Sequence, residues 1–357
     1  MRWGRSNRKT IGHVGVLTPF EARDRAQRVL GNIAHGRDPD HGLVGSQLGI
    51  TLGDLVDGRY GHWAQAHYAN PDDTLTRLKR CFGHWYQEAL VDISPAMIDA
   101  WIAQRLRDGI SGSTVNRDIS VLGAVFTRAV TWELVHKSPV REVTKCHVDK
   151  NPVTRFLTPT EQKRLTQTLA ARDERKRQKR VKANQWRMER RYPLLRTIGK
   201  YCDHLTPMVL VSLYTGCRRG ELLSLTWNQV DINRRLLTLP GSRTKNGQTR
   251  IVNLNSAAVA TLTQWRKDSN SLFVFAGPEG QPLSYLKTAW SRVLREAEIE
   301  RFRWHDLRHT FASNLVMAGV DLNTVRELLG HSDITMTLRY AHLASEHKAA
   351  AVEKLCA

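Results

Sequence analysis

The chain has 357 residues, of which 41% are hydrophobic and 25% are charged. At roughly 150 residues per domain this length favours two or three domains and excludes one small domain, and the composition excludes wholesale disorder and fibrous structure. Lysine and arginine number 54 against 34 aspartates and glutamates, a formal net charge of +20, so a polyanion is the expected partner.

Nucleic acid and the anionic membrane surface are the two common polyanions. The longest apolar run, at about residues 208–214, is much shorter than the ~18 residues of a spanning helix, and the first twenty residues lack a signal-peptide pattern. We therefore expect a cytosolic, DNA-associated protein. The five cysteines are widely spread and form no Cys-x-x-Cys pair, so neither a disulfide framework nor a metal site is expected, and no cofactor is predicted.

Residues 1–40 predict a small amino-terminal module, in which a short strand pair is followed by a helix. Thr18 is a typical N-cap with Pro19 at the first helical position, and Gly36 marks the end of that helix. A module of this size buries little apolar surface on its own. Glycine-rich residues 40–50 predict a linker to the next domain.

Residues 51–147 predict an all-helical domain of four helices. Typical start signals stand at Thr51, Asn70, Ser94 and Ser113. In the fourth helix, apolar side chains recur every three or four residues and line one face: Val115, Ile119, Leu122, Phe126 and Val130. The polar side chains around the start of that helix are the candidate DNA contacts of this domain: Thr114, Asn116 and Arg117.

Residues 155–345 predict a second domain, mostly helical with a small antiparallel β-sheet. Thr158, Pro159 and Glu161 form a helix start. Two β-rich runs, 236–239 and 250–254, flank an Asn-Gly pair, which is a strong hairpin signal, and helices are expected to resume after Leu286. The overall fold class is therefore α+β in this domain, beside a separate all-α domain.

The segment 172–191 carries ten lysines or arginines against three acidic residues. A solvated helix face and a surface that contacts DNA phosphates explain this run equally well. If the second explanation holds, the candidate DNA-binding residues are Arg175, Lys176, Arg177, Lys179 and Arg180.

Three motifs carry candidate chemistry: residues 215–221, residues 305–309, and residues 330–332 with Tyr340 nine residues after His331. On a helix, residues 305 and 308 point the same way, so a histidine and an arginine there can hold one small anion. A second guanidinium, at position 218, would add bidentate contacts to a phosphodiester that lysine cannot reproduce. Leu307 and its i+4 and i+8 neighbours are expected to anchor this helix through a separate apolar face. Taken alone, His305 is explained as a surface histidine, Arg218 and Arg308 as members of surface ion pairs, and Tyr340 as a half-buried aromatic. Only their joint occurrence favours a phosphodiester site.

The sequence resembles the tyrosine site-specific recombinases, and among them the integrases of phages, prophages and genomic islands. Their catalytic signature is T-G-x-R-x-x-E, a hairpin lysine, H-x-x-R, G-H-S and then a tyrosine. This chain has each element in that order: residues 215–221, Lys245, residues 305–308, residues 330–332 and Tyr340. The helical domain is similar to the family's core-site DNA-binding domain. Residues 1–40, with Glu-Ala-Arg at 21–23, are similar to an abbreviated arm-binding module.

The resemblance implies a catalytic role for each motif residue. Tyr340 would attack the scissile phosphate and form a 3'-phosphotyrosine, while Arg218 and Arg308 neutralise charge in the transition state and His331 donates a further hydrogen bond. Lys245 would protonate the leaving 5'-oxygen, and His305 would assist removal of the tyrosine proton. Arg219 and His309 lie beside the motif positions and are assigned to the surface, and Glu221 is expected to orient the neighbouring arginine or cap the backbone.

The resemblance also implies partners. The expected substrate is double-stranded DNA carrying attachment sites, bound by a homotetramer in the bacterial cytoplasm, with accessory DNA-bending and directionality proteins as further candidates. Residues 346–357 form a carboxy-terminal tail with a weak apolar stripe, for which docking on a neighbouring protomer is favoured over packing on its own domain.

Three functions remain open at this point. The first is a recombinase that integrates or excises a mobile element. The second is a type IB topoisomerase, which uses the same residues but rejoins the same strand, and the third is a decayed integrase that binds DNA without cutting it. The helical domain favours specific site binding and hence the recombinase, and the intact set of motif residues gives no support to decay.

Overall fold

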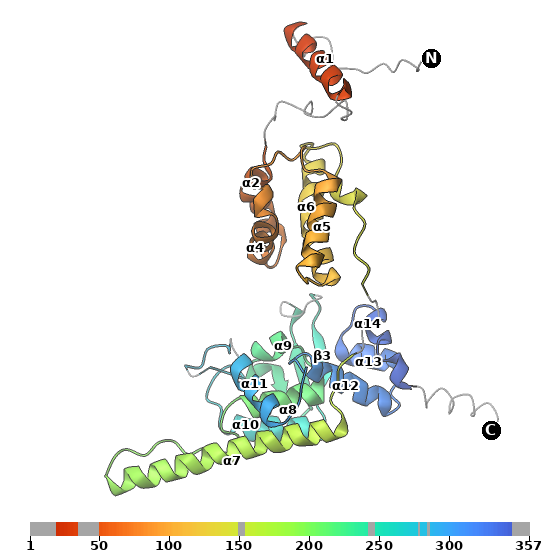
Figure 1. The fold of residues 1–357 in the computed structure, drawn as a ribbon. Helices are drawn as coiled ribbons and strands as arrows, with labels where there is room; N and C mark the ends of the chain where they lie inside the picture. Colours follow the sequence, from red (N-terminus) through yellow and green to blue (C-terminus); the bar gives the residue numbers. More distant parts are fainter. Residues whose placement is uncertain are drawn as a thin grey trace, which may run out of the picture. The chain divides into compact units, whose positions relative to one another are not determined.

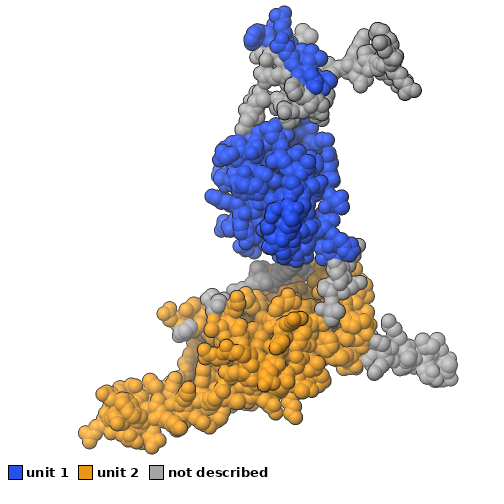
Figure 2. Space-filling view, viewed as in Figure 1, with its two compact units in different colours: residues 1–150 blue, residues 151–357 orange. Residues whose placement is uncertain are grey.

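The computed structural model describes residues 19–34, 50–148, 154–241, 247–277, 279–283 and 286–344. The chain divides into two compact units, residues 1–150 and 151–357 (Figure 2). Each unit has its own hydrophobic core. Within the described ranges, no helix is both long enough and apolar enough to span a bilayer.

The described part of the amino-terminal module is helix α1 (Pro19–Ala34), which confirms the helix predicted there. The strand pair, Thr18, Gly36 and the glycine-rich linker lie outside the described residues.

Unit 1 is helical between residues 50 and 148 (Figure 1). Its helices start largely where the capping signals predict. Thr51 Oγ1 accepts a hydrogen bond from Asp54 N at 3.1 Å, and Ser94 Oγ accepts one from Met97 N at 3.3 Å. The elements are α2 (Leu52–Leu55), a π-helical turn (Val56–Tyr60), α3 (Gly61–His67), α4 (Pro71–Phe82), α5 (Pro95–Arg107), α6 (Gly112–Thr131), and two 3₁₀ turns (Gly83–Trp85 and Pro139–Glu142).

The predicted start of the fourth helix is wrong by two residues. Ser111, not Ser113, is the N-cap of α6, because its side chain accepts the hydrogen bond from Thr114 N. The predicted apolar face of α6 is confirmed, with Val115, Leu122 and Phe126 fully buried. Together with α4 and α5 it forms the core of unit 1.

Unit 2 begins with α7 (Pro159–Glu189), the longest described helix, which extends well beyond the body of the unit (Figure 1). Its start confirms the predicted capping box, because Thr158 Oγ1 accepts from Glu161 N at 3.2 Å and the Glu161 carboxylate accepts from Thr158 N at 2.9 Å. The remaining helices are α8 (Leu205–Thr215), α9 (Arg219–Leu223), α10 (Ser256–Arg266), α11 (Lys287–Glu296), α12 (Asp306–Met317), α13 (Leu322–Leu329) and α14 (Thr335–Leu338), with 3₁₀ turns at Trp227–Gln229 and Ala341–Ala344.

A three-stranded antiparallel sheet lies beside these helices, in the order β1 (Val230–Asp231), β2 (Leu236–Leu239), β3 (Arg250–Asn253). The predicted hairpin is confirmed, since β2 and β3 pair with Leu237 opposite Val252. These two side chains are buried and join the core of unit 2. The mostly helical fold class with a small antiparallel sheet is therefore confirmed.

The expectation that helices resume only after Leu286 is wrong. Helix α10 follows the sheet directly and packs against α8. The sequence carried a local start signal for this helix, the N-cap residue Asn255. Its Oδ1 accepts a hydrogen bond from Ala258 N at 2.8 Å.

Candidate active site

Two helices of unit 2 end at a glycine in the left-handed conformation, and a predicted catalytic residue follows each glycine within two positions. Gly216 (φ +62°) ends α8 two residues before Arg218, and Gly330 (φ +63°) ends α13 immediately before His331. A Cβ at Gly216 would lie 2.5 Å from Phe311, and one at Gly330 would lie 2.6 Å from Arg250. The glycines of both motifs are therefore required by backbone geometry and by close packing.

Glu221 links two guanidinium groups across the site. Its side chain is 3% exposed and accepts from Arg218 Nη1 at 2.9 Å and from Arg250 Nη2 at 2.8 Å. It also accepts from the backbone N–H of Arg218 at 2.7 Å, so that it caps α9. This confirms the expected orienting and capping role of Glu221. It also brings in Arg250, on β3, which sequence reasoning missed.

Arg308 lies on α12 and is 3% exposed. Its Nη1 donates to Gly216 O at 2.8 Å and its Nη2 to Leu329 O at 2.6 Å. Burial first, and then the charges of Arg218 and Arg250, lower the pKa of Arg308 to about 9, which leaves it protonated at neutral pH.

The expected separation of a polar face and an apolar face on α12 is wrong. The helix is enclosed on several sides, and its polar residues are buried together with Leu307 and Val316. The buried polar residues are Asp306, Arg308, His309, Thr310 and Ser313.

The C-terminal carbonyls of α13 bring the three arginines together. Arg218 donates to Gly330 O at 3.3 Å, Arg308 donates to Leu329 O, and Arg250 donates to Leu328 O at 3.3 Å and also to Leu329 O. A helix C-terminus carries partial negative charge, which offsets part of the repulsion between the guanidiniums. Glu221 offsets one full charge.

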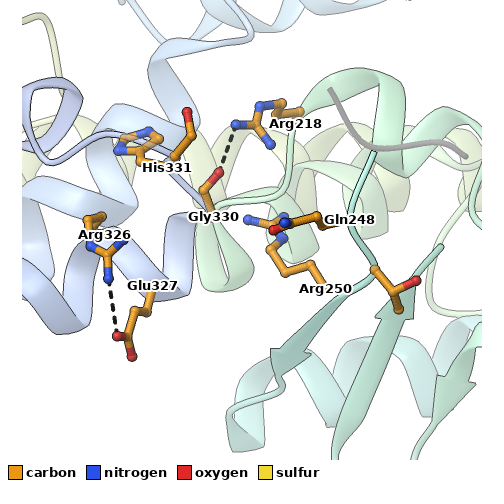
Figure 3. Close-up of a pocket in the computed structure, with 9 residues that line it drawn as sticks. Arg218, Gln248, Arg250, Arg326, Glu327, Gly330 and His331 are labelled. Carbon is orange, nitrogen blue, oxygen red and sulfur yellow. Dashed lines mark hydrogen bonds and ion pairs between the residues drawn. The ribbon is translucent and has the colours of Figure 1, made fainter. Parts of the chain in front are cut away.

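A cavity of about 460 Å³ opens at this cluster (Figure 3). It is lined by Arg218, Gln248, Thr249, Arg250, Arg326, Glu327, Gly330, His331 and Ser332. In Figure 3, Arg218 and Arg250 come from one side of the cavity and His331 from the other, with Gly330 between them. Counting Arg308 and Glu221 behind its wall, four arginines face two glutamates, which leaves two positive charges uncompensated. The cavity therefore suits a small anion.

His331 is held at the cavity by α14. Its Nδ1 lies 2.9 Å from Thr337 Oγ1, and burial followed by the charges of Arg308 and Arg218 lowers the pKa of His331 to about 3. The ring is therefore neutral near pH 7. In the tautomer in which the Thr337 hydroxyl donates to Nδ1, the ring proton is on Nε2 and His331 can donate a hydrogen bond.

Tyr340 lies outside the lining of this cavity. It is 1% exposed and packs in a small core formed by Ala312, Val316, Val325 and Leu329. Its hydroxyl makes a 2.6 Å hydrogen bond with Nδ1 of His309. The assignment of His309 to the surface is therefore wrong, because the side chain turns inward from α12 and is 9% exposed.

The other two predicted catalytic residues are placed differently. His305 precedes α12, and its residue surface is exposed, although partial burial of the ring and the charge of Arg308 lower the pKa of its imidazole. Its ring packs edge-on against that of His309, with 5.0 Å between centroids. Lys245 lies outside the described residues. The structure thus brings together Arg218, Arg308 and His331, while Tyr340 lies outside the lining of the cavity.

The predicted DNA-binding residues of α7 are largely engaged within unit 2. Arg175 pairs with Glu296 at 2.5 Å, and Lys176 pairs with Asp203 at 2.9 Å. Arg177 and Arg180 donate to backbone carbonyls of residues 196–200. The contacts of Lys176, Arg177 and Arg180 attach the segment that follows α7, and that of Arg175 attaches α11. Neither interpretation of the basic run included this role.

Two of the three predicted DNA contacts of α6 are also hydrogen-bonded within their own unit, and the third is exposed. Asn116 exchanges two 2.8 Å hydrogen bonds with the backbone of Cys146, and the Thr114 hydroxyl lies 2.9 Å from Ser111 Oγ. Arg117 is exposed.

A basic face on α11 was missed by sequence reasoning. Lys287, Thr288, Ser291, Arg292 and Arg295 line one hollow of about 390 Å³, and their spacing places them on one side of the helix. Arg292 also lines the neighbouring hollow of about 330 Å³ against α7, with Arg172, Arg175, Lys176 and Lys179. The signal was present in the sequence as basic residues at i, i+5 and i+8. Among the described residues, no three His, Cys, Asp or Glu side chains gather into a group that could hold a metal.

Residues 195–347 match the model of the phage integrase family. The similarity to this family therefore lies within unit 2. The match spans the whole candidate site, from α8 to the turn after Tyr340. The integrase of Salmonella phage P22 is 30% identical over 228 residues, which cover 60% of this chain and 50% of that protein. The tyrosine recombinase XerC of Xanthomonas campestris is 37% identical over 142 residues, covering 38% and 43%. The matched region thus spans about half the length of these curated relatives.

The fold also has solved counterparts. The integrase of transposon Tn1549, determined in complex with transposon right-end DNA, superimposes with a TM-score of 0.68 over 86% of this chain and all of that one, at 19% identity. The likeness at this level of identity establishes a shared fold.

Proposed function

We propose that this protein is a site-specific DNA recombinase of the integrase type. It would cleave and rejoin duplex DNA through a 3'-phosphotyrosine and thereby integrate or excise a mobile element. The observation that carries the proposal is the cavity with two uncompensated positive charges, lined by Arg218 and His331 and backed by Arg308. It lies in the phage integrase domain, on the motifs that give this family its signature.

The cavity has the chemistry that a phosphodiester requires. Arginine guanidiniums present paired donors to non-bridging oxygens, and a buried arginine stabilises added negative charge more strongly than an exposed one. Both arginines are already held in place, by Glu221 and by the carbonyls at the end of α13. Little reorganisation is then needed when charge develops in the transition state.

The proposed reaction consists of two transesterification steps at the same phosphorus. His305 assists removal of the Tyr340 proton as Tyr340 Oη forms a bond to phosphorus and the bond to the 5'-oxygen breaks. Lys245 supplies the proton that turns this oxygen into a 5'-hydroxyl. Attack by a 5'-hydroxyl of the partner strand then releases Tyr340. Because the phosphotyrosine retains the energy of the phosphodiester, rejoining requires no nucleotide cofactor.

Duplex DNA would extend from the cavity over basic surfaces. On unit 2 we propose the basic face of α11 in addition to the α7 residues Arg175, Lys176, Arg177, Lys179 and Arg180, and on unit 1 we propose Thr114, Asn116 and Arg117. We further propose that unit 1 between residues 51 and 147 is the core-site domain, that a homotetramer assembles on the DNA, and that the reaction takes place in the bacterial cytoplasm. The exposed cations of α11 favour that helix, since the described residues provide no ion pair for Lys287, Arg292 or Arg295.

Replacement of the nucleophile tests the proposal. On a duplex nicked close to the cleavage site, the wild-type protein should accumulate a covalent protein–DNA adduct that resists denaturing electrophoresis. Tyr340→Phe should form none while binding the duplex with unchanged affinity, because only one oxygen is removed. Tyr192→Phe, at a 52% exposed tyrosine of the same unit, is the matched control and should behave as wild type. An adduct formed by Tyr340→Phe would refute the assignment.

The same preparation separates recombination from relaxation. Sequencing the junctions of two marked duplexes after reaction should show exchanged strands for a recombinase. A type IB topoisomerase would instead relax supercoiled DNA and leave both duplexes parental.

A further inference from the structure

Tyr340 and His309 form a buried hydrogen-bonded pair, and the proposed chemistry gives His309 no role. The 2.6 Å bond from the tyrosine hydroxyl ends on Nδ1 of His309, and the two rings lie 5.9 Å apart between centroids. Four aliphatic side chains from α12 and α13 enclose the phenol ring. Within the described part of the chain, His309 is the group that satisfies the hydrogen-bonding capacity of this hydroxyl.

The location of this pair opposes attack on a bound phosphate. The anion cavity is lined from α9, β3 and α13, and neither Tyr340 nor His309 belongs to its lining. A phenol that is 1% exposed presents almost no surface to an anion in the cavity while it remains where it is. For the hydroxyl to approach phosphorus, the bond to His309 must break.

The protonation states fit a hydrogen bond better than a proton transfer. Burial raises the pKa of Tyr340 to about 12. Burial and the neighbouring His305, followed by Arg339 and Arg308, lower the pKa of His309 to about 4. The phenol and the imidazole are therefore both neutral near pH 7, and the hydrogen bond joins them without proton transfer.

We infer that His309 is a positioning residue that holds the Tyr340 hydroxyl in a withdrawn place, and that release of this hydrogen bond precedes cleavage. The inference rests on the proposed function, in which Tyr340 is the nucleophile. It assigns His309 a role opposite to that of a general base, because loss of the imidazole acceptor should speed the first cleavage rather than slow it.

Two replacements at position 309 separate the hydrogen bond from the volume of the ring. His309→Phe keeps an aromatic ring but has no acceptor. His309→Asn is smaller but places an amide oxygen at the position of Nδ1, two bonds from Cβ. A buried hydroxyl that has lost its acceptor carries a free-energy cost. We expect this cost to shift the equilibrium about tenfold from the held toward the released tyrosine.

The first measurement needs no DNA. Nitration of the full-length protein with tetranitromethane, followed by peptide mass spectrometry, reports the accessibility of each tyrosine. Tyr340 should be protected in wild type and in His309→Asn, and modified about tenfold faster in His309→Phe. Tyr201, which is 7% exposed in unit 2, should remain protected in all three and so reports that the fold of unit 2 is intact.

The second measurement is the rate of covalent adduct formation on the nicked duplex at saturating protein. It should rise about tenfold in His309→Phe and remain close to wild type in His309→Asn, with DNA affinity unchanged in both. Unchanged nitration of Tyr340 in His309→Phe would overturn the inference. A fall in adduct rate of about 10² in both variants would also overturn it and would make His309 a proton acceptor. If the wild type itself forms no adduct, the proposed function fails, while nitration still decides whether His309 holds Tyr340.

Discussion

Glu221 should contribute more to the stability of unit 2 than any other single carboxylate of the site. It is 3% exposed and accepts three hydrogen bonds, of 2.7, 2.8 and 2.9 Å, from Arg218 and Arg250. Glu221→Gln keeps the shape but removes the charge between two guanidiniums, and its amide NH₂ faces a donor. Removing one partner of a buried ion pair costs about 3–5 kcal/mol, and we expect a loss of about 3 kcal/mol because one oxygen remains as an acceptor.

The assay is urea unfolding of the full chain, followed by hydrogen exchange in peptides from α9 and α13, so that the signal comes from unit 2. Glu327→Gln is the matched control. Its side chain lines the same cavity but is 64% exposed, and its carboxylate accepts from Arg326 at 3.3 Å and from Asn323 at 3.5 Å, so loss of its charge should change the free energy of unfolding by less than about 1 kcal/mol. If the two variants differ by less than about 1 kcal/mol, the reasoning that Glu221 compensates the arginine cluster is wrong.

Three further predictions concern the site and its surroundings. Arg308→Lys should slow cleavage by on the order of 10² or more, since an ammonium cannot reproduce the planar fork that bonds Gly216 O and Leu329 O, and equal single-turnover rates would contradict this. The folded-state pKa of His331, about 3, lies below its ordinary value of about 6.5, so its contribution to stability is present above pH ~6.5 and is lost as the pH falls toward 3. Unfolding free energies measured from pH 7 to pH 4 should therefore fall less steeply for His331→Gln than for wild type, and parallel slopes would exclude a neutral buried His331. The exposed cations of α11 are Lys287, Arg292 and Arg295. Replacing them by alanine should reduce the slope of log K for DNA binding against log[salt] by about 0.9 for each DNA phosphate that the variant no longer binds. The slope should change less when the ion-paired Arg175 and Lys176 are replaced instead.

The local parts of the fold were predictable because their signals lie within a few residues of each other. The capping boxes at Thr51 and Thr158 each close over three residues, and the β2–β3 hairpin joins two runs separated by ten residues. The misplaced start of α6 and the missed helix α10 are also local errors, since Ser111 and Asn255 carried the correct cap signals. In the same way, the order of the motifs alone indicated which residues belong to the site.

The sequence could not show how those residues meet. The hydrogen bond from Arg218 to Gly330 spans 112 positions and that from Arg308 to Gly216 spans 92, and Arg250 joins Glu221 from 29 positions away. No periodicity connects His309 to Tyr340 across 31 positions, and a histidine next to a motif arginine reads as surface until α12 is seen to be enclosed. Helix starts and turns follow from short-range sterics and hydrogen bonds, which a few neighbouring residues specify. The charge balance of the cavity and the withdrawn position of Tyr340 depend on which distant segments pack together, and only the tertiary structure decides that.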